Sequence, residues 1–165
     1  MYTPQDAIRT PQDAMHTLQN AKKKAMNILA ARSHCTKELT DKLTKAEFDE
    51  YVIADVIEWA VEYRFLDDTE YARRFIDTAI AKKHGHKKIE RDLIQKGIDR
   101  FTAEDVLAEY SFNEAETLRP LIEKRLTGDF SPKNRAKVSR YFAGKGFSFS
   151  DISDIIQALC RDAQD

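Results

Sequence analysis

The stretch HKKIERDLIQKGI at His86–Ile98 decides the fold, because its apolar pattern occurs three times in the chain. It aligns with TKELTDKLTKAEF at Thr36–Phe48 and with RAKVSRYFAGKGF at Arg135–Phe147. Apolar residues three or four positions apart mark the buried face of a helix, and a period of roughly 50 residues indicates tandem repeats. Five apolar positions match in all three copies: Leu39, Leu43, Phe48, Val56 and Ile57; Ile89, Leu93, Ile98, Val106 and Leu107; Val138, Phe142, Phe147, Ile155 and Ile156.

Each copy is predicted to fold as helix, helix, short turn and helix. The sequence therefore predicts an all-α protein of three tandem three-helix repeats that form an elongated, curved array without strands. The predicted repeats span residues 22–66, 67–112 and 113–165. A repeat of this size buries roughly 60% or less of its surface, so it gains stability by stacking on its neighbours.

The first 21 residues are predicted to form a flexible N-terminal arm. They contain the pentapeptide TPQDA twice, at Thr3–Ala7 and Thr10–Ala14. Thr followed by Pro is a good helix start. Two such starts seven residues apart cannot both open long helices, so regular helix is expected only from Lys22 onward.

The breaks between the apolar stripes carry residues typical of helix ends. Asp49 is predicted to cap one helix, and the Asp67–Asp68 pair is predicted to cap the helix that follows it. Gly97 and the equivalent Gly146 are predicted to end their helices. His34 and His84 occupy equivalent positions, which indicates a shared structural role at a helix junction.

The composition excludes several classes of protein. The 165 residues contain 27 basic and 28 acidic side chains, so the net charge of −1 excludes a uniformly basic nucleic-acid binder. Cys35 and Cys160 lie too far apart in sequence for a disulfide framework or a cysteine metal cluster. No apolar run approaches the ~20 residues of a membrane span, and no signal peptide is visible. A cytoplasmic protein that is not bound to a membrane is expected.

The charges are nevertheless segregated along the chain. Residues 22–45 carry a net charge of +5, and residues 47–70 carry −8. Residues 82–100 carry +4, residues 104–116 contain five carboxylates and no base, and residues 119–145 carry +6. Such charge blocks would steer and orient a large charged partner. The simpler interpretation is that these charged helix faces are exposed to solvent and bind nothing. A salt-dependent contact with DNA phosphates is the other use of the same cations.

No catalytic, cofactor or metal site is predicted. The GKGF stretch at residues 144–147 lacks the upstream glycine and the Ser or Thr of a phosphate loop. Cys35 lies near a helix start, where a thiolate is favoured, but no histidine–acid pair is arranged around it. Cys160 is expected to lie in the core. Trp59 and Tyr63 are interpreted as packing residues rather than a partner surface. We therefore expect a protein that is not an enzyme.

Four segments resemble the RecX family, the bacterial regulators of the RecA recombinase. They are ILAARSHCTKELTDKL at Ile28–Leu43, RFLDDTEYARRF at Arg64–Phe75, HGHKKIERDLIQKGI at His84–Ile98 and KVSRYFAGKGFSFSDI at Lys137–Ile152. The resemblance covers residues 22–161. It implies an all-helical protein of three repeats that binds in the groove of the RecA–DNA filament, limits filament extension, and lowers ATP hydrolysis, strand exchange and co-protease activity.

The resemblance and the charge blocks together predict a monomeric negative regulator of homologous recombination and the SOS response, with weak direct DNA contact. The alternative is a helical DNA-binding protein that blocks filaments by masking DNA. The predicted partner-binding residues are basic side chains near the helix junctions: Arg32, Lys82, Lys83, Lys87, Lys88, Arg91, Arg125, Lys133, Arg135, Lys137 and Arg140.

Overall fold

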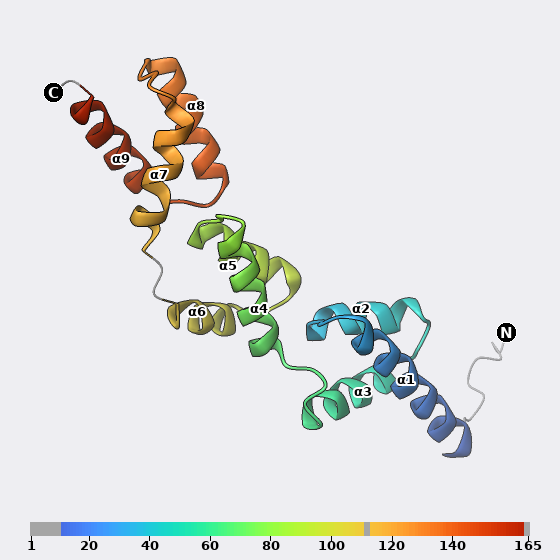
Figure 1. Cartoon of the computed structure of the whole chain (residues 1–165). Coiled ribbons are helices and arrows are strands. Elements are labelled where there is room, and N and C mark those ends of the chain that lie inside the picture. The colour runs from blue at the N-terminus through green and yellow to red at the C-terminus, as the bar shows by residue number, and fades with distance from the viewer. Residues whose placement is uncertain (1–10, 111–112, 164–165) are drawn as a thin grey trace. The chain divides into compact units, whose positions relative to one another are not determined.

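The computed structural model describes residues 11–110 and 113–163 of the chain (Figure 1). This part contains nine helices and no strand, as the sequence predicts. The helices are α1 (Pro11–Ala31), α2 (Thr36–Lys45), α3 (Glu50–Glu62), α4 (Asp68–Ala81), α5 (His86–Lys96), α6 (Arg100–Ala108), α7 (Glu114–Leu126), α8 (Pro132–Gly144) and α9 (Phe149–Asp162).

The described chain forms two compact units. Unit 1 holds the described residues up to Tyr71 together with Lys96–Ile98, and unit 2 holds Ala72–Gln95 and the described residues from Asp99 onward. The contacts between residues divide the described chain into two units and do not mark three repeats. The predicted repeat boundaries are therefore not tested and stay predictions. The boundary after residue 112 falls on residues outside the described part.

The matched apolar positions form the cores of the units. Thirteen of the fifteen are buried, and the other two, Phe48 and Ile57, pack half-buried against the core of unit 1. In unit 1 that core lies among α1, α2 and α3. In unit 2 one core lies among α7, α8 and α9, where Phe142 meets Phe147 edge to face. The helical period of the sequence therefore identifies the buried faces correctly.

Helix α1 begins at Pro11 and not at Lys22. The second TPQDA thus supplies the start of a regular helix, with Pro11 as its first residue, where a missing N–H costs nothing. Ala21 and Ala25 are fully buried, which anchors this helix in the core of unit 1. The first TPQDA and the rest of the predicted arm up to Thr10 lie outside the described residues.

The repeat is also visible in the backbone at the end of each second helix. Glu47, Gly97 and Gly146 occupy equivalent positions and have φ values of +62°, +94° and +90°. This left-handed conformation closes a helix and favours glycine. The predicted C-terminal role of Gly97 and Gly146 is confirmed, and Glu47 performs the same turn with an exposed side chain.

The two glycines have a second reason to be glycine. A Cβ on Gly97 would meet the side chain of Lys37, with Lys37 Cβ 2.5 Å away, within unit 1. A Cβ on Gly146 would meet the Cα of Lys88 at 2.8 Å, along with its N and Cβ, within unit 2. Such separations are far below contact distance, so each glycine admits another helix against its backbone.

The two residues of the Asp67–Asp68 pair cap two different helices. Asp67 Oδ1 accepts the N–H of Glu70 at 2.9 Å, which caps α4. The sequence predicts a share of that role for Asp68, but Asp68 Oδ1 accepts the N–H of Thr36 at 2.7 Å. It thereby caps α2, whose own N-cap residue, Cys35, makes no side-chain capping bond. The prediction was wrong for Asp68, because its position beside α4 in the sequence does not show which backbone N–H its carboxylate faces in the fold. That N–H belongs to Thr36.

The same division recurs in unit 2. Asn113 caps α7 by accepting from the N–H of Glu116, and Glu114 Oε1 accepts the N–H of His86, the first residue of α5. His86 is the repeat equivalent of Thr36. In both units the first residue of one helix therefore satisfies the first amide of another helix.

We expect Asp68→Ala to lower the free energy of unfolding of unit 1 by about 1 kcal/mol, the usual value of a helix cap. Trp59, the only tryptophan of the chain, lies in α3 of unit 1, so its fluorescence in a urea titration reports this unit. Asp68→Asn keeps an acceptor oxygen and should lose less. An Asp68→Ala titration that overlays the wild type would contradict the capping role.

Candidate partner-binding site

A concentration of positive charge surrounds a pocket in unit 2 with a volume of about 490 Å³. The pocket lies between the turn after α4 and the adjoining faces of α7 and α8. Its lining residues are Lys82, Lys83, Leu121, Lys124, Arg125, Thr127, Tyr141, Phe142 and Lys145.

Helical spacing explains which side chains meet there. Leu121 and Arg125 are four residues apart on α7, and Tyr141 and Lys145 are four residues apart at the end of α8, so each pair shares a helix face. Phe142, 4% exposed, joins this wall to the core of unit 2. The floor of the pocket is therefore apolar and its rim is cationic.

Five cations line this pocket, and no carboxylate is among its described lining residues. The guanidinium of Arg125 lies 3.5 Å from the centre of the Tyr141 ring, and Lys145 Nζ lies 5.9 Å from it. The ring faces attract both cations and hold Arg125 in place. The pKa of His84, on the turn after α4, is lowered by burial and then by the positive charges of Lys145 and Lys88. The arrangement suits a carboxylate or phosphate flanked by an apolar group.

A second hollow of about 290 Å³ lies at the start and along one side of α8. Lys133, Lys137 and Arg140 line it, together with Asp129, Ser131 and Asn134. Here Asp129 Oδ1 accepts the N–H of Ser131 at 2.9 Å, and Ser131 caps α8. No aromatic ring is among the described residues of this hollow, so it offers charge and hydrogen bonds without an apolar floor.

The structure brings only some of the predicted contact residues together. Lys82, Lys83 and Arg125 line the first pocket, and Lys133, Lys137 and Arg140 line the second hollow. On α5, Lys87 is exposed, Lys88 pairs with Asp92 at 2.5 Å, and Arg91 lies 3.9 Å from Asp92. Arg135 is half-buried, and its Nε is buried without a hydrogen-bond partner among the described residues.

Sequence reasoning missed Lys124, Tyr141 and Lys145 as site residues. Lys124 and Lys145 belong to the basic block 119–145, but nothing in the sequence says that α7 and α8 turn them toward Lys82. The only signal was the i, i+4 spacing of Leu121 with Arg125 and of Tyr141 with Lys145, which places an apolar residue beside each cation.

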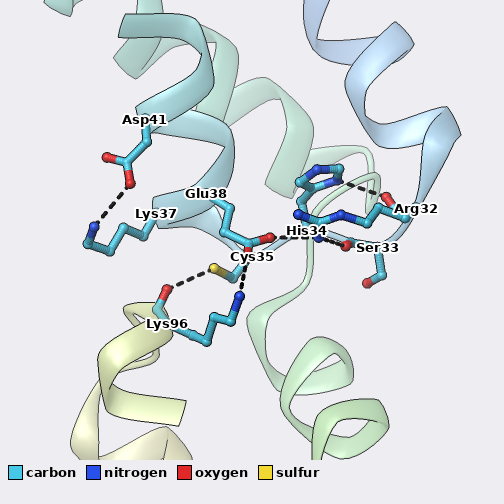
Figure 2. A network of polar contacts seen from close by, with 8 residues as sticks. All are labelled: Arg32, Ser33, His34, Cys35, Lys37, Glu38, Asp41 and Lys96. Atoms are coloured by element: carbon cyan, nitrogen blue, oxygen red, sulfur yellow. Dashed lines mark hydrogen bonds and ion pairs between the residues drawn. The ribbon is translucent and has the colours of Figure 1, made fainter. Parts of the chain in front are cut away.

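Arg32 lies in unit 1 and is engaged internally (Figure 2). Its Nη1 donates to Ser33 O at 2.7 Å and to Glu38 Oε2 at 2.8 Å, while Lys96 Nζ donates to Glu38 Oε1 at 2.8 Å. Burial raises the pKa of Glu38, but the hydrogen bonds from Lys96 and Arg32 outweigh it, and the pKa falls below its ordinary value. Glu38, with 14% of its side chain exposed, is thus held ionised between two cations.

Cys35 stands beside this ion network as a neutral thiol. It is fully buried, and its Sγ donates a hydrogen bond to Lys96 O at 3.1 Å (Figure 2). Burial raises the pKa of the thiol, which opposes the thiolate that a position near a helix start favours. Cys160 packs half-buried against the core of unit 2.

His34 is buried in the turn before α2. Its Nδ1 lies 2.8 Å from Arg32 O, and its Nε2 is buried without a partner among the described residues. Burial lowers the pKa of His34 below its ordinary 6.5, the Arg32 hydrogen bond opposes this, and the charge of Arg32 adds to the lowering. His84 is only half-buried, and its backbone N–H donates to Ala79 O at 3.0 Å, so the two histidine residues differ in burial.

We expect unit 1 to lose stability as the pH falls below about 6.5. The unfolded His34 ring binds a proton near its ordinary pKa of 6.5, whereas the folded ring resists protonation until the pH reaches its lower folded pKa. The free energy of unfolding therefore falls with pH between these two values. Urea titrations at a series of pH values from 8 to 5, followed by Trp59 fluorescence, measure this dependence of the free energy of unfolding on pH. His34→Gln should flatten this dependence, and an unaltered slope in that variant would assign it to other groups.

Neither a metal site nor a membrane span is found in the described part of the chain. Within it, no group of three or more His, Cys, Asp or Glu side chains stands close enough to hold a metal ion. None of the described helices has the length and apolar character that a membrane crossing requires.

Comparisons with known proteins agree on one family. Family models described as the first and second three-helix domains of RecX match residues 21–59 and 67–107. The chain is 34% identical to regulatory protein RecX of Clostridium acetobutylicum over 149 residues, which covers 84% of this chain and 68% of that protein.

It is 30% identical to regulatory protein RecX of Serratia proteamaculans, over 84% of this chain and 95% of that protein. The crystal structure of RecX from Lactobacillus salivarius superposes with a TM-score of 0.79 at 29% identity, covering 88% of this chain and 97% of that one. With two three-helix domains matched and relatives at this identity over most of their length, the chain belongs to the RecX family.

Proposed function

We propose that the protein is a negative regulator of the RecA recombinase. It binds in the groove of the RecA–DNA filament, limits filament extension, and inhibits ATP hydrolysis, strand exchange and co-protease activity. Homologous recombination and the SOS response are thereby restrained. Membership of a family of regulatory proteins supports the regulatory role, and the geometry of unit 2 supports the mode of contact.

The observation that carries the proposal is the pocket whose five cations surround an apolar floor. Such a pocket fits an acidic protein segment that carries an apolar side chain. The carboxylates of the segment would pair with the cations of the rim, and its apolar side chain would displace water from the floor. Electrostatic complementarity of this kind fixes orientation and speeds association. With a net charge of −1, the protein is not drawn to bulk polyanions as a whole.

The alternative is that the protein masks DNA and so denies it to RecA. The second hollow favours this alternative, because Lys133, Lys137 and Arg140 can contact DNA phosphates there, beside the single carboxylate of Asp129. Direct DNA binding would then be steeply salt-dependent.

One experiment separates the two functions. RecA ATP hydrolysis on single-stranded DNA is measured with substoichiometric protein, and affinity for bare DNA is measured across a salt series. Inhibition with only weak DNA affinity supports filament binding. Loss of inhibition whenever excess DNA is supplied would favour masking, and no effect on RecA would refute both.

The proposal includes a non-catalytic, monomeric, cytoplasmic protein built from three repeats with the predicted boundaries. Its inhibition should need no cofactor, and sedimentation velocity should give one species of 19.0 kDa.

A further inference from the structure

The two units contain the same kind of helix junction. In unit 1 the turn before α2 contacts the last residue of α5, where Cys35 Sγ donates to Lys96 O at 3.1 Å. In unit 2 the turn before α5 contacts the end of α8, where the N–H of Gly85 donates to Lys145 O at 2.8 Å. Gly85 is the repeat equivalent of Cys35, and Lys145 is that of Lys96. Equivalent side chains therefore occupy equivalent places at the two junctions.

A carboxylate bridges two cations at the unit 1 junction. Glu38 Oε2 accepts from Arg32 Nη1 at 2.8 Å, and Glu38 Oε1 accepts from Lys96 Nζ at 2.8 Å (Figure 2). Each oxygen thus serves one cation, and only 14% of the Glu38 side chain is exposed. Charge-assisted hydrogen bonds of this kind are about twice as strong as neutral ones. The unit 1 junction is therefore closed by an anion that the chain itself supplies.

The unit 2 junction has the two cations without the bridging carboxylate. Lys82 is the repeat equivalent of Arg32. Lys145, the equivalent of Lys96, lines the unit 2 pocket of about 490 Å³ together with Lys82. Both cations lie near His84, whose pKa is lowered first by burial and then by charges that include theirs. No carboxylate is among the described lining residues of the pocket, so the anion that closes the first junction has no counterpart there.

Two exchanged residues explain the difference. Glu38 and Lys42 are four residues apart on α2. Their repeat equivalents on α5 are Lys88 and Asp92, so the acid and the base have changed places. Lys88 Nζ pairs with Asp92 at 2.5 Å, which keeps this carboxylate one helical turn away from the place that Glu38 takes in unit 1. That place is left for an acid from outside the chain.

We propose that Lys82 and Lys145 form a binding site for one carboxylate, supplied by a glutamate or aspartate side chain of a partner protein. Unit 1 provides the template, since it holds a carboxylate between the equivalent cations. The apolar floor of Leu121 and Phe142 favours a protein segment over a phosphate, because an apolar neighbour of the acidic residue covers it. This inference deepens the proposed function and rests on it, because RecA is the protein that would carry the carboxylate.

The test gives the unit 2 junction the charges of the unit 1 junction. The variant Lys88→Glu with Asp92→Lys, here called the exchange variant, keeps the net charge of the chain. Its new carboxylate should fill the site, so the dose that halves RecA ATP hydrolysis on single-stranded DNA should rise on the order of 30-fold, the value of one hydrogen bond between charged groups. Unit 2 should at the same time unfold at a higher urea concentration in far-ultraviolet circular dichroism, because Lys82 and Lys145 gain an internal partner. A damaged fold would lose stability together with potency.

Two further variants complete the test. Arg100→Glu with Glu104→Arg exchanges an exposed ion pair of the same spacing on α6, whose atoms are 2.9 Å apart, and should inhibit within about twofold of the wild type. Lys82→Gln with Lys145→Gln removes the two cations and should weaken inhibition as much as the exchange variant does, which keeps the test decisive if the exchange variant fails to fold. All four changes at the junction should together lose no more potency than either pair, because both pairs remove the same contact.

Each outcome decides something different. Wild-type potency in the exchange variant and in the glutamine variant would overturn the carboxylate site and leave the proposed function standing. Losses that add up when the two pairs are combined would overturn it as well, because the two pairs would then act at separate places. A parallel fall in affinity for bare single-stranded DNA would make phosphate the occupant and also overturn the proposal. A wild-type chain without effect on RecA would overturn the proposed function, and the inference with it.

Discussion

Replacement of Gly146 by alanine is expected to lower the free energy of unfolding of unit 2 by about 3 kcal/mol, from backbone strain and overpacking together. At φ +90° an L side chain is strained, which costs about 1–2 kcal/mol. The new Cβ would also lie 2.8 Å from the Cα of Lys88, so α5 must move away from the end of α8. Overpacking of this kind costs about 1–3 kcal/mol.

Two other glycines separate these contributions. Gly128 has φ +78°, but a Cβ added there would have no neighbour within 4 Å, so Gly128→Ala should show the backbone cost alone. Gly144, the last residue of α8, has neither a positive φ nor a near neighbour, so Gly144→Ala should be neutral or slightly stabilising. The expected order of stability is Gly144→Ala, then Gly128→Ala, then Gly146→Ala.

Far-ultraviolet circular dichroism in urea is the appropriate measurement, because Trp59 lies in unit 1 and does not report on unit 2 directly. Equal losses for Gly128→Ala and Gly146→Ala would show that the close approach to Lys88 carries no energy. That result would contradict the second role assigned to this glycine.

The sequence sufficed for the helices and for their buried faces, because both follow from local spacing. Leu39, Ile89 and Val138 could be assigned to the core from their spacing alone, since a helical period leaves one face to bury. The equivalence of Glu47 with Gly97 and Gly146 was less visible, because the shared property is a backbone angle and only two of the three residues are glycine. The start of α1 was misplaced because two equal start signals precede it.

The site was predictable in charge but not in geometry. The basic blocks contain every cation of the unit 2 pocket, yet the sequence does not distinguish Lys124, which lines it, from Lys88, which pairs with Asp92. Long side chains have several partners within reach, and the helix packing selects one. The bond from Thr36 N–H to Asp68 shows the same limit, since it joins residues 32 positions apart.

Reversal of charge in the unit 2 pocket should weaken inhibition of RecA by on the order of 100-fold, which corresponds to roughly 2.7 kcal/mol of binding free energy. The variant is Lys82→Glu, Lys124→Glu and Arg125→Glu, which places three carboxylates where the proposed function needs cations. The dose of protein that halves RecA ATP hydrolysis measures the effect. The loss should shrink as salt is raised, because exposed charges are screened.

The matched control makes the same change in net charge at exposed lysines of unit 1, with Lys23→Glu, Lys24→Glu and Lys45→Glu. If the total charge governed inhibition, both variants would lose potency equally, and the pocket would have no special role. If the pocket is the contact, only the first variant fails while both keep wild-type helix content. The affinity of the pocket variant for bare DNA then identifies the ligand. If its DNA affinity falls together with its inhibition at every salt concentration, the pocket binds phosphate. If its weak DNA affinity is unchanged, the pocket binds the acidic surface of a protein.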